Sequence, residues 1–575
     1  MDNDDVAKVL DEIADLLEIQ DESRFRVQAY HRAANCIRSL SEDINEIYEE
    51  GRLQRLSAVG KGIAEKIGEL LTKGETEYHE ELKEKIPPSL VELIQIQSLG
   101  PRKAKFLYEE LNIQTVDDLL EAIEAHKLAP LKGFGAKSEE NILRGVKQFM
   151  KGRERILLSE AYPMAERIIN HLKEQPFVLR IDMAGSLRRM KETIGDIDLL
   201  AASREPSKAM DHFCRLPEVD QVLAKGETKS SILAKNGLQV DLRVVTPEQY
   251  GSALQYFTGS KEHSIHLRDI AKKRGLKINE YGLFEVDSDT RIAGEDEEEI
   301  YSKLNMQYIP PFMREDKGEI ELAIENRLPK LVEPEDIKGD LHVHSSWSDG
   351  LNKIEEIAET ARAMGYSYVA ICDHAERLKI AGGLSEVEVR RRTERIRQLN
   401  EGLQGFTILA GIELNIDNDG KLDYGDDLLQ ELDVVVASIH AGFNQPPETL
   451  TGRILAAISN PYVDIIAHPT GRIMGKRPPY PIDLNAVFKA ASATGTFLEL
   501  NSFPDRLDLR DDYLREAKAH GVKIAVNTDA HTIGHLRNII YGVATAKRGW
   551  LEPDDVINTY PLDKLLGVLK SKSKR

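Results

Sequence analysis

The spacing of apolar residues predicts that the first part of the chain is helical. Val6, Leu10 and Ile13 repeat at intervals of three to four residues, and short glycine-containing turns separate similar segments up to about residue 155. From Phe177 the pattern changes to short β-rich runs, FVLRIDMAG, DIDLLAA and LQVDLRVV. We therefore expect an all-α N-terminal part followed by an α+β region.

Strand-like apolar runs alternate with helical segments from Gly339 onward. The runs include DLHVHS, YSYVAICDH, FTILAGIEL, DVVVASIH and KIAVNTDAH. Such alternation predicts a parallel sheet or an α/β barrel. The preceding polar and acidic stretch LPKLVEPEDIKG indicates a linker, which we expect at residues 317–337.

Length and composition describe a multidomain globular protein. The chain has 575 residues, 41% apolar and 30% charged, without an apolar run long enough to cross a bilayer. Its first residues, MDNDDVAKVL, lack the layout of a signal peptide. Three cysteines far apart suggest neither a disulfide framework nor a thiolate zinc site. We expect a cytoplasmic protein that makes no membrane contact.

The net charge of −20 argues by itself against a nucleic-acid partner, but the charge is uneven. KGFGAKSEENILRGVKQFMKGRER and KEHSIHLRDIAKKRGLK are basic, whereas DNDGKLDYGDDLLQELD is strongly acidic. An acidic protein with local basic surfaces is compatible with DNA.

Three glycine turns interrupt the helical part, each beside lysine. A turn of this kind leaves backbone N–H groups free at the start of the next helix, where they suit a phosphate. Ordinary glycine caps are the alternative for any single turn, but three copies with adjacent lysines favour DNA. The turns resemble helix-hairpin-helix motifs, and the candidate DNA-binding residues are Gly60, Gly62, Gly100, Lys103, Gly133, Gly135 and Lys137.

Two neighbouring carboxylates in GSLRRMKETIGDIDLL suggest a cation site. In a strand Asp196 and Asp198 project to the same face, and QVDLRVV supplies Asp241 from a second strand. Three converging carboxylates repel one another, and Mg²⁺ or Mn²⁺ would offset that repulsion. A solvated strand end is the alternative for DID alone. The Gly185-Ser186 turn upstream offers donors for phosphate oxygens.

These motifs, GSLRR, GDID, VDLR and YFTGS, resemble the palm of family X DNA polymerases. The resemblance implies that Asp196 and Asp198 bridge two metal ions, and that Asp241 completes one site and helps activate a primer 3′-hydroxyl. It also implies a template minor-groove contact for Arg268 and a weakened base contact at Ser264, where many relatives carry asparagine. The implied nucleotide-binding residues are Gly185, Ser186, Arg189, Gly195, Tyr256, Phe257 and Gly259.

The N-terminal segments FRVQAYHRAANCI and VGKGIAEKI resemble the small lyase-type domain of the same family. Lys66 falls where lyase-competent members place a Schiff-base lysine. Gly62 and Arg26 depart from the family pattern, so a DNA-binding surface lysine is the alternative for Lys66. With either role, the resemblance implies that Arg26, Tyr30 and Gly62 bind the 5′-phosphate of a gap.

Histidines and carboxylates gather at the predicted strand ends of the C-terminal part. The carboxyl ends of barrel strands are where barrel enzymes assemble active sites. Imidazole and carboxylate ligands without thiolates suit Zn²⁺, Mn²⁺ or Fe²⁺, and the set is too large for one ion, so we expect three. Hydrogen-bonded core histidines are the alternative for any one of them. The candidate ligands are His342, His344, Asp349, His374, Glu413, His440, His468, Asp529 and His531.

This segment resembles the PHP (polymerase and histidinol phosphatase) family, a distorted (β/α)7 barrel with a trinuclear metal centre. Arg472 and Arg377 are candidate phosphate contacts there. The resemblance implies one metal site of His342, His344, Glu413 and Asp529, a second of Glu413, His440 and His468, and a third of Asp349, His374 and His531.

Together the two resemblances imply a bacterial or archaeal family X DNA polymerase with a C-terminal PHP domain. Such a protein would fill gapped or nicked double-stranded DNA with dNTPs in base excision repair. The barrel would act as a 3′–5′ exonuclease, and we leave abasic-site incision open. We expect a monomer. The alternatives are a DNA-end-binding scaffold with a structural PHP domain, a template-independent nucleotidyltransferase, and a phosphatase of small phosphates.

The changes of pattern divide the chain into six expected segments. They are a helical lyase-like DNA-binding domain at 1–88, a helical fingers-type subdomain at 89–155, a nucleotidyltransferase palm at 156–260, a thumb at 261–316, the linker at 317–337 and the PHP barrel at 338–575.

Overall fold

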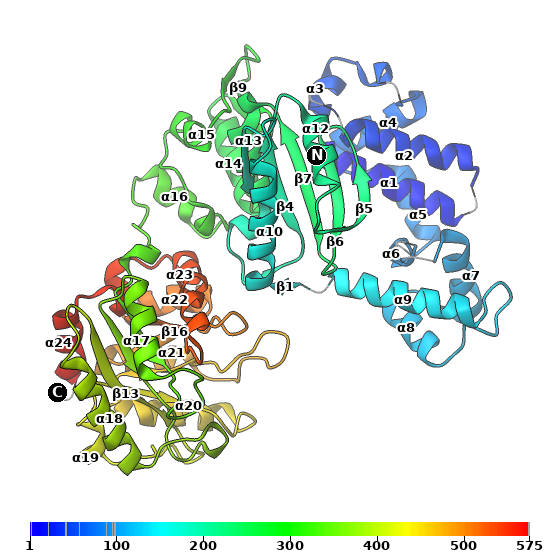
Figure 1. The fold of residues 1–575 in the computed structure, drawn as a ribbon. Coiled ribbons are helices and arrows are strands. Elements are labelled where there is room, and N and C mark those ends of the chain that lie inside the picture. Colours follow the sequence, from blue (N-terminus) through cyan, green and yellow to red (C-terminus); the bar gives the residue numbers. More distant parts are fainter. Residues whose placement is uncertain are drawn as a thin grey trace.

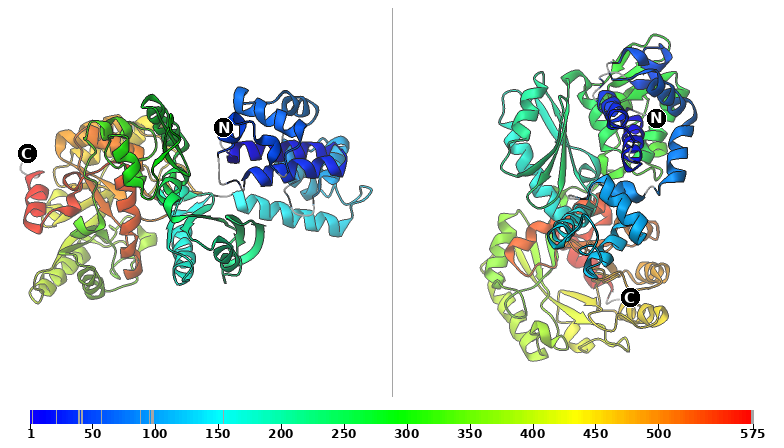
Figure 2. Two further views of the ribbon diagram at one scale, coloured as in Figure 1. Left: turned by 90° about the horizontal axis from the view of Figure 1, so that it is seen from above. Right: turned by 90° about the vertical axis from the view of Figure 1, so that its right-hand side faces the viewer.

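The computed structural model describes residues 1, 3–20, 22–38, 40, 43–56, 58–87, 89–94, 96, 99–153 and 155–572. A helical N-terminal domain and a C-terminal barrel lie at opposite ends, with the palm and thumb between them (Figures 1 and 2). Within this part of the chain, no helix combines the length and the apolar character needed to pass through a bilayer.

The N-terminal helices pack around one apolar core. A continuous cluster of buried side chains runs from Val6 to Val146, so the domains expected at 1–88 and 89–155 share this core. Helix α1 packs against α2, α4, α5, α6 and α7. The helices are α1 (Asn3–Ile19), α2 (Arg24–Arg38), α3 (Ile44–Glu49), α4 (Lys61–Lys73), α5 (Glu77–Lys85), α6 (Ser89–Leu93), α7 (Pro101–Leu111), α8 (Val116–Glu124) and α9 (Ala136–Arg153).

The palm is a five-stranded sheet in the order β2-β4-β7-β6-β5, in which β4 and β7 are parallel and the other neighbours antiparallel. Leu199, Val240 and Leu242 pack into an apolar cluster with helices α10 and α12, so alternate residues of β4 and β7 face the other side. The elements are β1 (Ile156–Leu157), α10 (Leu158–Lys173), β2 (Arg180–Met183), α11 (Gly185–Arg188), β3 (Thr193–Ile194), β4 (Ile197–Ala202), α12 (Pro206–Phe213), β5 (Val219–Lys225), β6 (Lys229–Ala234) and β7 (Gln239–Val245).

The thumb includes a helix inside the segment expected to be a linker. Ile320 and Ala323 of this helix, α16, are buried in the thumb's apolar cluster, and Glu319 is hydrogen-bonded to His263 at 2.7 Å. The many charged residues of the segment hid this short helix from the sequence pattern. Helix α13 (Tyr250–Thr258) packs against palm strand β4. The thumb elements are α14 (Lys261–Lys273), β8 (Leu276–Asn279), β9 (Gly282–Glu285), β10 (Arg291–Ala293), α15 (Glu297–Lys303) and α16 (Glu319–Ile324).

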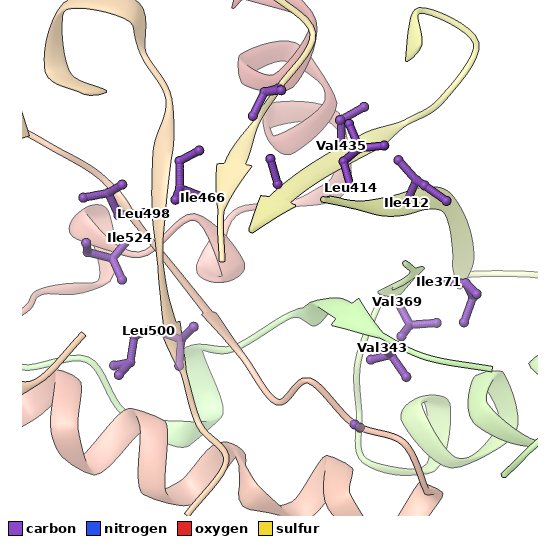
Figure 3. Close-up of a cluster of buried hydrophobic side chains, with 14 of the residues drawn as sticks. Val343, Val369, Ile371, Ile412, Leu414, Val435, Ile466, Leu498, Leu500 and Ile524 are labelled. Atoms are coloured by element: carbon purple, nitrogen blue, oxygen red, sulfur yellow. The ribbon is translucent and has the colours of Figure 1, made fainter. Parts of the chain in front are cut away.

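Seven parallel strands in chain order form the C-terminal barrel. Val343 pairs with Ala530 beyond the seventh strand, so the sheet is nearly closed. Ile412, Val435 and Leu498 share one apolar cluster with the helices that cover the strands (Figure 3). The strands are β11 (Gly339–Val343), β12 (Tyr368–Ile371), β13 (Thr407–Asn415), β14 (Val434–Ser438), β15 (Ile465–Ile466), β16 (Phe497–Asn501) and β17 (Ile524–Asn527). The helices are α17 (Ile354–Ala363), α18 (Glu386–Asn400), α19 (Asp426–Leu429), α20 (Pro447–Ser459), α21 (Leu484–Thr494), α22 (Asp511–Ala519), α23 (Ile539–Arg548) and α24 (Leu562–Lys572).

Side chains from each domain are packed into its neighbour. Leu507 of the barrel is 1% exposed and lies in the apolar cluster of the palm. Trp550 of the barrel packs against the thumb cluster. Lys277 of the thumb forms an ion pair with Glu46 of the N-terminal domain. The predicted fold class, a helical N-terminal part with a palm, a thumb and a seven-stranded α/β barrel, is confirmed.

Candidate active sites and nucleic-acid interface

Two neighbouring palm strands bring three carboxylates together. Asp198 of β4 and Asp241 of β7 are register partners in parallel strands, and Asp196 lies directly before β4. Gln239 Nε2 donates to Asp241 Oδ1 at 2.9 Å, and Lys229 Nζ lies 3.3 Å from Asp241 Oδ2. The sequence predicted the three carboxylates but neither Gln239 nor Lys229, because both lie on strands whose pairing was unknown.

Burial and mutual repulsion make ionisation of these carboxylates costly. Burial, followed by the charges of Asp196 and Asp241, raises the pKa of Asp198 to about 7. Burial and the charge of Asp241 raise the pKa of Asp196 as well. A bound divalent cation reverses this balance because it favours the ionised form of each ligand. The trio therefore fits the Mg²⁺ or Mn²⁺ site expected from the sequence.

The glycine before Ser186 gives the turn its close approach to the carboxylates. Gly185 has a φ of +57°, and a Cβ there would lie 2.1 Å from Asp198 Oδ2. The preceding amide, of Ala184, donates to the carbonyl of Asp198 at 2.8 Å. Glycine therefore lets the turn approach β4 closely, since a side chain there would have to displace the Asp198 carboxylate.

Arg189 is engaged at the junction of the palm and thumb. Its Nε donates to Glu315 Oε1 at 3.0 Å, and Nη1 donates to the carbonyl of Thr258. A Cβ on Gly259 would lie 3.2 Å from Arg189 Nη1. The structure thus brings Arg189 and Gly259 together, and a triphosphate would have to displace Glu315 from Arg189. Sequence reasoning did not anticipate Glu315.

The two aromatic residues of YFTGS lie beside an arginine that the sequence analysis missed. The rings of Tyr256 and Phe257 pack edge to face with centroids 5.0 Å apart. The guanidinium of Arg243 lies 4.3 Å from the centre of the Phe257 ring. Gly195 adjoins another missed arginine, Arg155, whose Nη1 would be 3.3 Å from a Cβ at that position.

The residues expected to contact the template lie on helix α14. Arg268 is partly exposed on this helix. Ser264 is buried, and its Oγ has no hydrogen-bond partner among the described residues.

The glycine turns of the N-terminal domain expose their backbone. Gly60 and Gly100 are the N-caps of α4 and α7. The third turn is tied to the second, because Lys103 Nζ donates to Ser138 Oγ at 3.2 Å. An added Cβ would meet no atom within 4 Å at Gly60, Gly62, Gly100, Gly133 or Gly135. Their backbones are therefore accessible to a DNA phosphate.

Residues predicted to bind a 5′-phosphate surround one tyrosine that the sequence analysis missed. The Nζ of Lys66 lies 4.7 Å from the centre of the Tyr78 ring and 3.4 Å from the carbonyl of Gly62. The guanidinium of Arg26 lies 5.4 Å from the same ring. Tyr30 stacks on Tyr78 with centroids 6.4 Å apart. The structure therefore brings all four predicted residues together.

Nine histidines and carboxylates converge at the carboxyl ends of the barrel strands. Their ligand atoms form three overlapping groups within 4.8 Å: His344, Asp349, His374 and His531; His342, His344 and Asp529; and His374, Glu413 and His440. His468 Nε2 lies 3.2 Å from Glu413 Oε1. The groups share His344 and His374, whereas the resemblance to the PHP family implied that each of these histidines belongs to one metal site.

Two ring nitrogens of this centre lack partners, as ligands without their ions would. The buried atoms His344 Nδ1 and His468 Nδ1 have no hydrogen-bond partner among the described residues, whereas His374 Nδ1 lies 2.8 Å from Glu413 Oε2. Although burial opposes it, Glu413 and Asp349 raise the pKa of His374 to about 10. Burial likewise opposes the shift of Glu413, but His440 and His374 hold its pKa well below the usual range. These histidines and carboxylates favour their charged forms because opposite charges surround them, and this clustered set of donors fits a group of metal ions.

A second layer of polar residues orients the ligands. Glu499, fully buried on β16, is bonded to His342 Nδ1 at 2.8 Å through Oε1 and accepts from the backbone N–H of His468 at 2.8 Å through Oε2. Asn415 Oδ1 lies 2.7 Å from His440 Nδ1. Such outer partners fix the ring orientation of metal ligands. The signal that could have found Glu499 was its place in LELN, at a predicted strand end.

The two arginines proposed as phosphate contacts in the barrel are engaged in ion pairs. Arg472 Nη1 and Nη2 bind Glu192 of the palm at 3.1 and 2.6 Å, so its role is domain contact. Arg377 Nη1 binds Asp417 at 2.7 Å and remains about half exposed. The sequence could not reveal the pair with Glu192, because the two residues belong to different domains.

Family profiles match most of the chain. Residues 1–76 match the helix-hairpin-helix domain, 90–148 the SAM-like helix-hairpin-helix tandem, 253–315 the DNA polymerase beta thumb and 340–560 the PHP domain. Fold and sites therefore define the class of DNA polymerases that carry a metal-binding PHP domain.

Full-length similarity specifies the family further. The chain is 39% identical over 568 residues to "DNA polymerase/3'-5' exonuclease PolX" of Bacillus subtilis (strain 168), covering 98% of this chain and 99% of that protein. The chain belongs to this PolX family. A protein of Thermoanaerobacter sp. (strain X514) named a probable phosphatase is 33% identical over 247 residues, covering 41% of this chain and 96% of that protein.

Proposed function

We propose that this protein fills short gaps in DNA by template-directed nucleotidyl transfer at the palm and removes nucleotides from 3′ ends at the barrel. The observation that supports this most strongly is the presence of two separate ligand sets in one chain. One set lies on the parallel palm strands, and the other lies at the barrel strand ends. Membership of a family whose Bacillus subtilis member is named a polymerase and 3'-5' exonuclease fits both reactions.

The palm residues have complementary roles in this proposal. Asp196 and Asp198 hold Mg²⁺ or Mn²⁺, and Asp241 completes the site beside the primer 3′-hydroxyl. Gln239 and Lys229 keep the Asp241 carboxylate in place. The incoming dNTP is bound through its phosphates by Gly185, Ser186, Gly195 and Arg189, and through its sugar by Tyr256, Phe257 and Gly259.

The barrel residues would hold three divalent ions, Mn²⁺, Zn²⁺ or Fe²⁺. When bound, ions at either site supply Lewis acidity, which lowers the pKa of the attacking oxygen and stabilises the charge that develops on phosphate. Glu499 and Asn415 orient the histidine ligands. Asp349 and His531 are the most exposed ligands, at about 30%, so we place the entrance for a DNA 3′ end beside them.

Gapped or nicked double-stranded DNA is the proposed partner. The open backbone of the three glycine turns and the cluster of Arg26, Tyr30 and Lys66 around Tyr78 support phosphate contacts on both sides of a gap. The protein would act in the cytoplasm, as a monomer, in base excision repair. Incision of abasic sites would be a further reaction of the barrel.

A 5′-phosphorylated one-nucleotide gap tests the proposal directly. The DNA is incubated with Mn²⁺, with and without dNTPs, using the wild type, Asp241→Ala and His344→Ala. We expect Asp241→Ala to lose extension alone and His344→Ala to lose degradation alone. Loss of both reactions in each variant would contradict two independent centres. If the wild type binds gapped DNA but neither extends nor degrades it, the scaffold alternative is favoured.

A phosphatase acting on small phosphates is the second candidate for the barrel. The similarity to the Thermoanaerobacter protein named a probable phosphatase covers 96% of that protein. Release of inorganic phosphate from a nucleoside monophosphate, together with failure to shorten a DNA 3′ end, would favour this function over the exonuclease.

A further inference from the structure

Arg506 lies beside Asp529, one of the candidate metal ligands of the barrel. Its Nε is 3.8 Å from Asp529 Oδ2, and its side chain is 22% exposed. The other oxygen, Oδ1, faces the metal-ligand histidines, at 3.1 Å from His344 Nε2 and 3.8 Å from His342 Nε2. Arg506 therefore borders the centre through the outer oxygen of a ligand.

The guanidinium of Arg506 has hydrogen-bonding capacity that the described residues do not use. Its Nη1 is buried and has no hydrogen-bond partner among them. A buried donor of this kind calls for a ligand, because leaving it unpaired is unfavourable. Asp529 does not depend on Arg506, since Asn501 Nδ2 already donates to the same Oδ2 at 3.1 Å.

The backbone around Arg506 is held in an unusual conformation. Leu507 has a φ of 41°, in the left-handed region that leucine rarely adopts. Arg472 Nε donates to the carbonyl of Arg506 at 2.7 Å, and Nη2 donates to the carbonyl of Leu507. Asp508 accepts from the N–H and Oγ1 of Thr470 at 3.0 and 2.9 Å. Strain that is maintained by surrounding contacts is typical of functional loops.

The palm takes part in holding this loop. The far side of the Arg472 guanidinium binds Glu192 at 3.1 and 2.6 Å, and Leu507 is buried in the palm's apolar cluster. Arg472 and Leu507 thus both contact the palm. Arg472 also holds the backbone carbonyls of Arg506 and Leu507. The position of Arg506 depends on the docking of the two domains.

We propose that Arg506 binds the scissile phosphate of the 3′-terminal nucleotide at the barrel centre, held in place by the palm through Glu192 and Arg472. A planar guanidinium matches two non-bridging phosphate oxygens. It would also stabilise the charge that grows on these oxygens during cleavage. The inference rests on the proposed nuclease function of the barrel.

The test compares Arg506→Gln, Arg506→Lys and Arg510→Gln with the wild type. Arg510 is the matched control, because it lies in the same loop but is exposed and pairs with Asp512 at 2.8 Å. We expect Arg506→Gln to lower kcat/KM for 3′-end degradation by about 100-fold, and Arg506→Lys to restore part of it. Arg510→Gln should degrade DNA, and every variant should extend a gap, at rates close to wild type.

Two readouts without turnover separate phosphate binding from a structural role. Thymidine 5′-monophosphate binding is measured by calorimetry with Mn²⁺. Binding that remains in His344→Ala, which lacks a barrel ligand, is taken as binding at the palm and is subtracted. We expect about tenfold weaker binding in Arg506→Gln, and weaker binding also in Glu192→Gln. Manganese content should remain unchanged in both. Loss of manganese in Arg506→Gln would overturn the proposal.

Failure of the inference can be told from failure of the proposed function. If the wild type degrades DNA and Arg506→Gln degrades it equally fast, Arg506 does not bind the scissile phosphate. If the wild type does not degrade DNA, the proposed nuclease fails. In that case, thymidine monophosphate binding that is lost in Arg506→Gln would still assign the phosphate site.

Discussion

Asp198 and Asp241 lie opposite each other as register partners of two parallel strands, β4 and β7. Parallel pairing places both carboxylates on the same face, and the α10 and α12 helices bury the other face. The sheet therefore forces the like charges together regardless of their repulsion. The instability of this arrangement can be measured.

Asp198→Asn should stabilise the protein in EDTA, increasingly so as the pH rises. The pKa of Asp198 is raised from 3.8 to about 7. The unfolded carboxyl ionises at a lower pH than the folded one. The wild type therefore loses stability as the pH rises from about 4 to about 7, because ionisation favours the unfolded chain. The melting temperatures of wild type and variant are compared at both ends of this range. A difference in melting temperature between variant and wild type that is the same at all pH values would contradict this account. So would a difference that persists in saturating Mg²⁺, because the ion offsets the repulsion in the wild type.

Gly185→Ala should abolish most gap extension, by about 100-fold or more, because its Cβ would lie 2.1 Å from Asp198 Oδ2. Gly275→Ala is the matched control, since Gly275 also has a positive φ, +72°, but has no atom within 4 Å of the added Cβ. The control should cost about 1 kcal/mol of stability and little activity. Gap extension and thermal unfolding measure both effects. Similar activity in the two variants would mean that the turn can move away from Asp198.

Manganese should bind to the barrel more tightly as the pH rises from about 6 to about 8, by at least tenfold per unit. The reason is that the pKa of His374 is raised to about 10, so a proton must leave before this imidazole can act as a ligand. Calorimetry or paramagnetic resonance at several pH values measures the slope. His374→Gln should lower the slope by about one. A slope of zero in the wild type would show that the ligands are already deprotonated.

Lys66→Ala should weaken gapped-DNA binding about tenfold and reduce the salt dependence by about one phosphate contact. The ammonium lies 4.7 Å from the centre of the Tyr78 ring beside Arg26, an arrangement suited to a phosphate. Lys73→Ala, on the last turn of the same helix, is the control. Borohydride trapping tests the other role: a covalent adduct with abasic DNA that disappears in Lys66→Ala would identify a Schiff-base lysine.

Local periodicity accounts for what could be predicted. Alternation along a strand places Asp196 and Asp198 on the same side, and the barrel geometry places His342, His440 and Asp529 at one end. These relationships need only the strand direction and the side-chain period. They therefore follow from short stretches of sequence.

What could not be predicted depends on contacts between distant segments. Glu192 is an ordinary surface-type residue until Arg472 of another domain reaches it. Tyr78 acquires its place because α5 packs against α1, which brings its ring to Lys66 of α4. Helix α16 is short and rich in glutamate, and its burial depends on distant residues: Ile320 and Ala323 pack into the thumb's apolar cluster, and Glu319 is bonded to His263.

Leu507 gives the palm and barrel a common piece of interior. A chain cut after residue 337 would leave the palm with a vacated apolar patch exposed to water, where Leu507 now lies in its cluster. The isolated polymerase part should therefore be prone to aggregation. Removing the barrel without exposing this patch would require polar replacements on the palm surface that Leu507 covers.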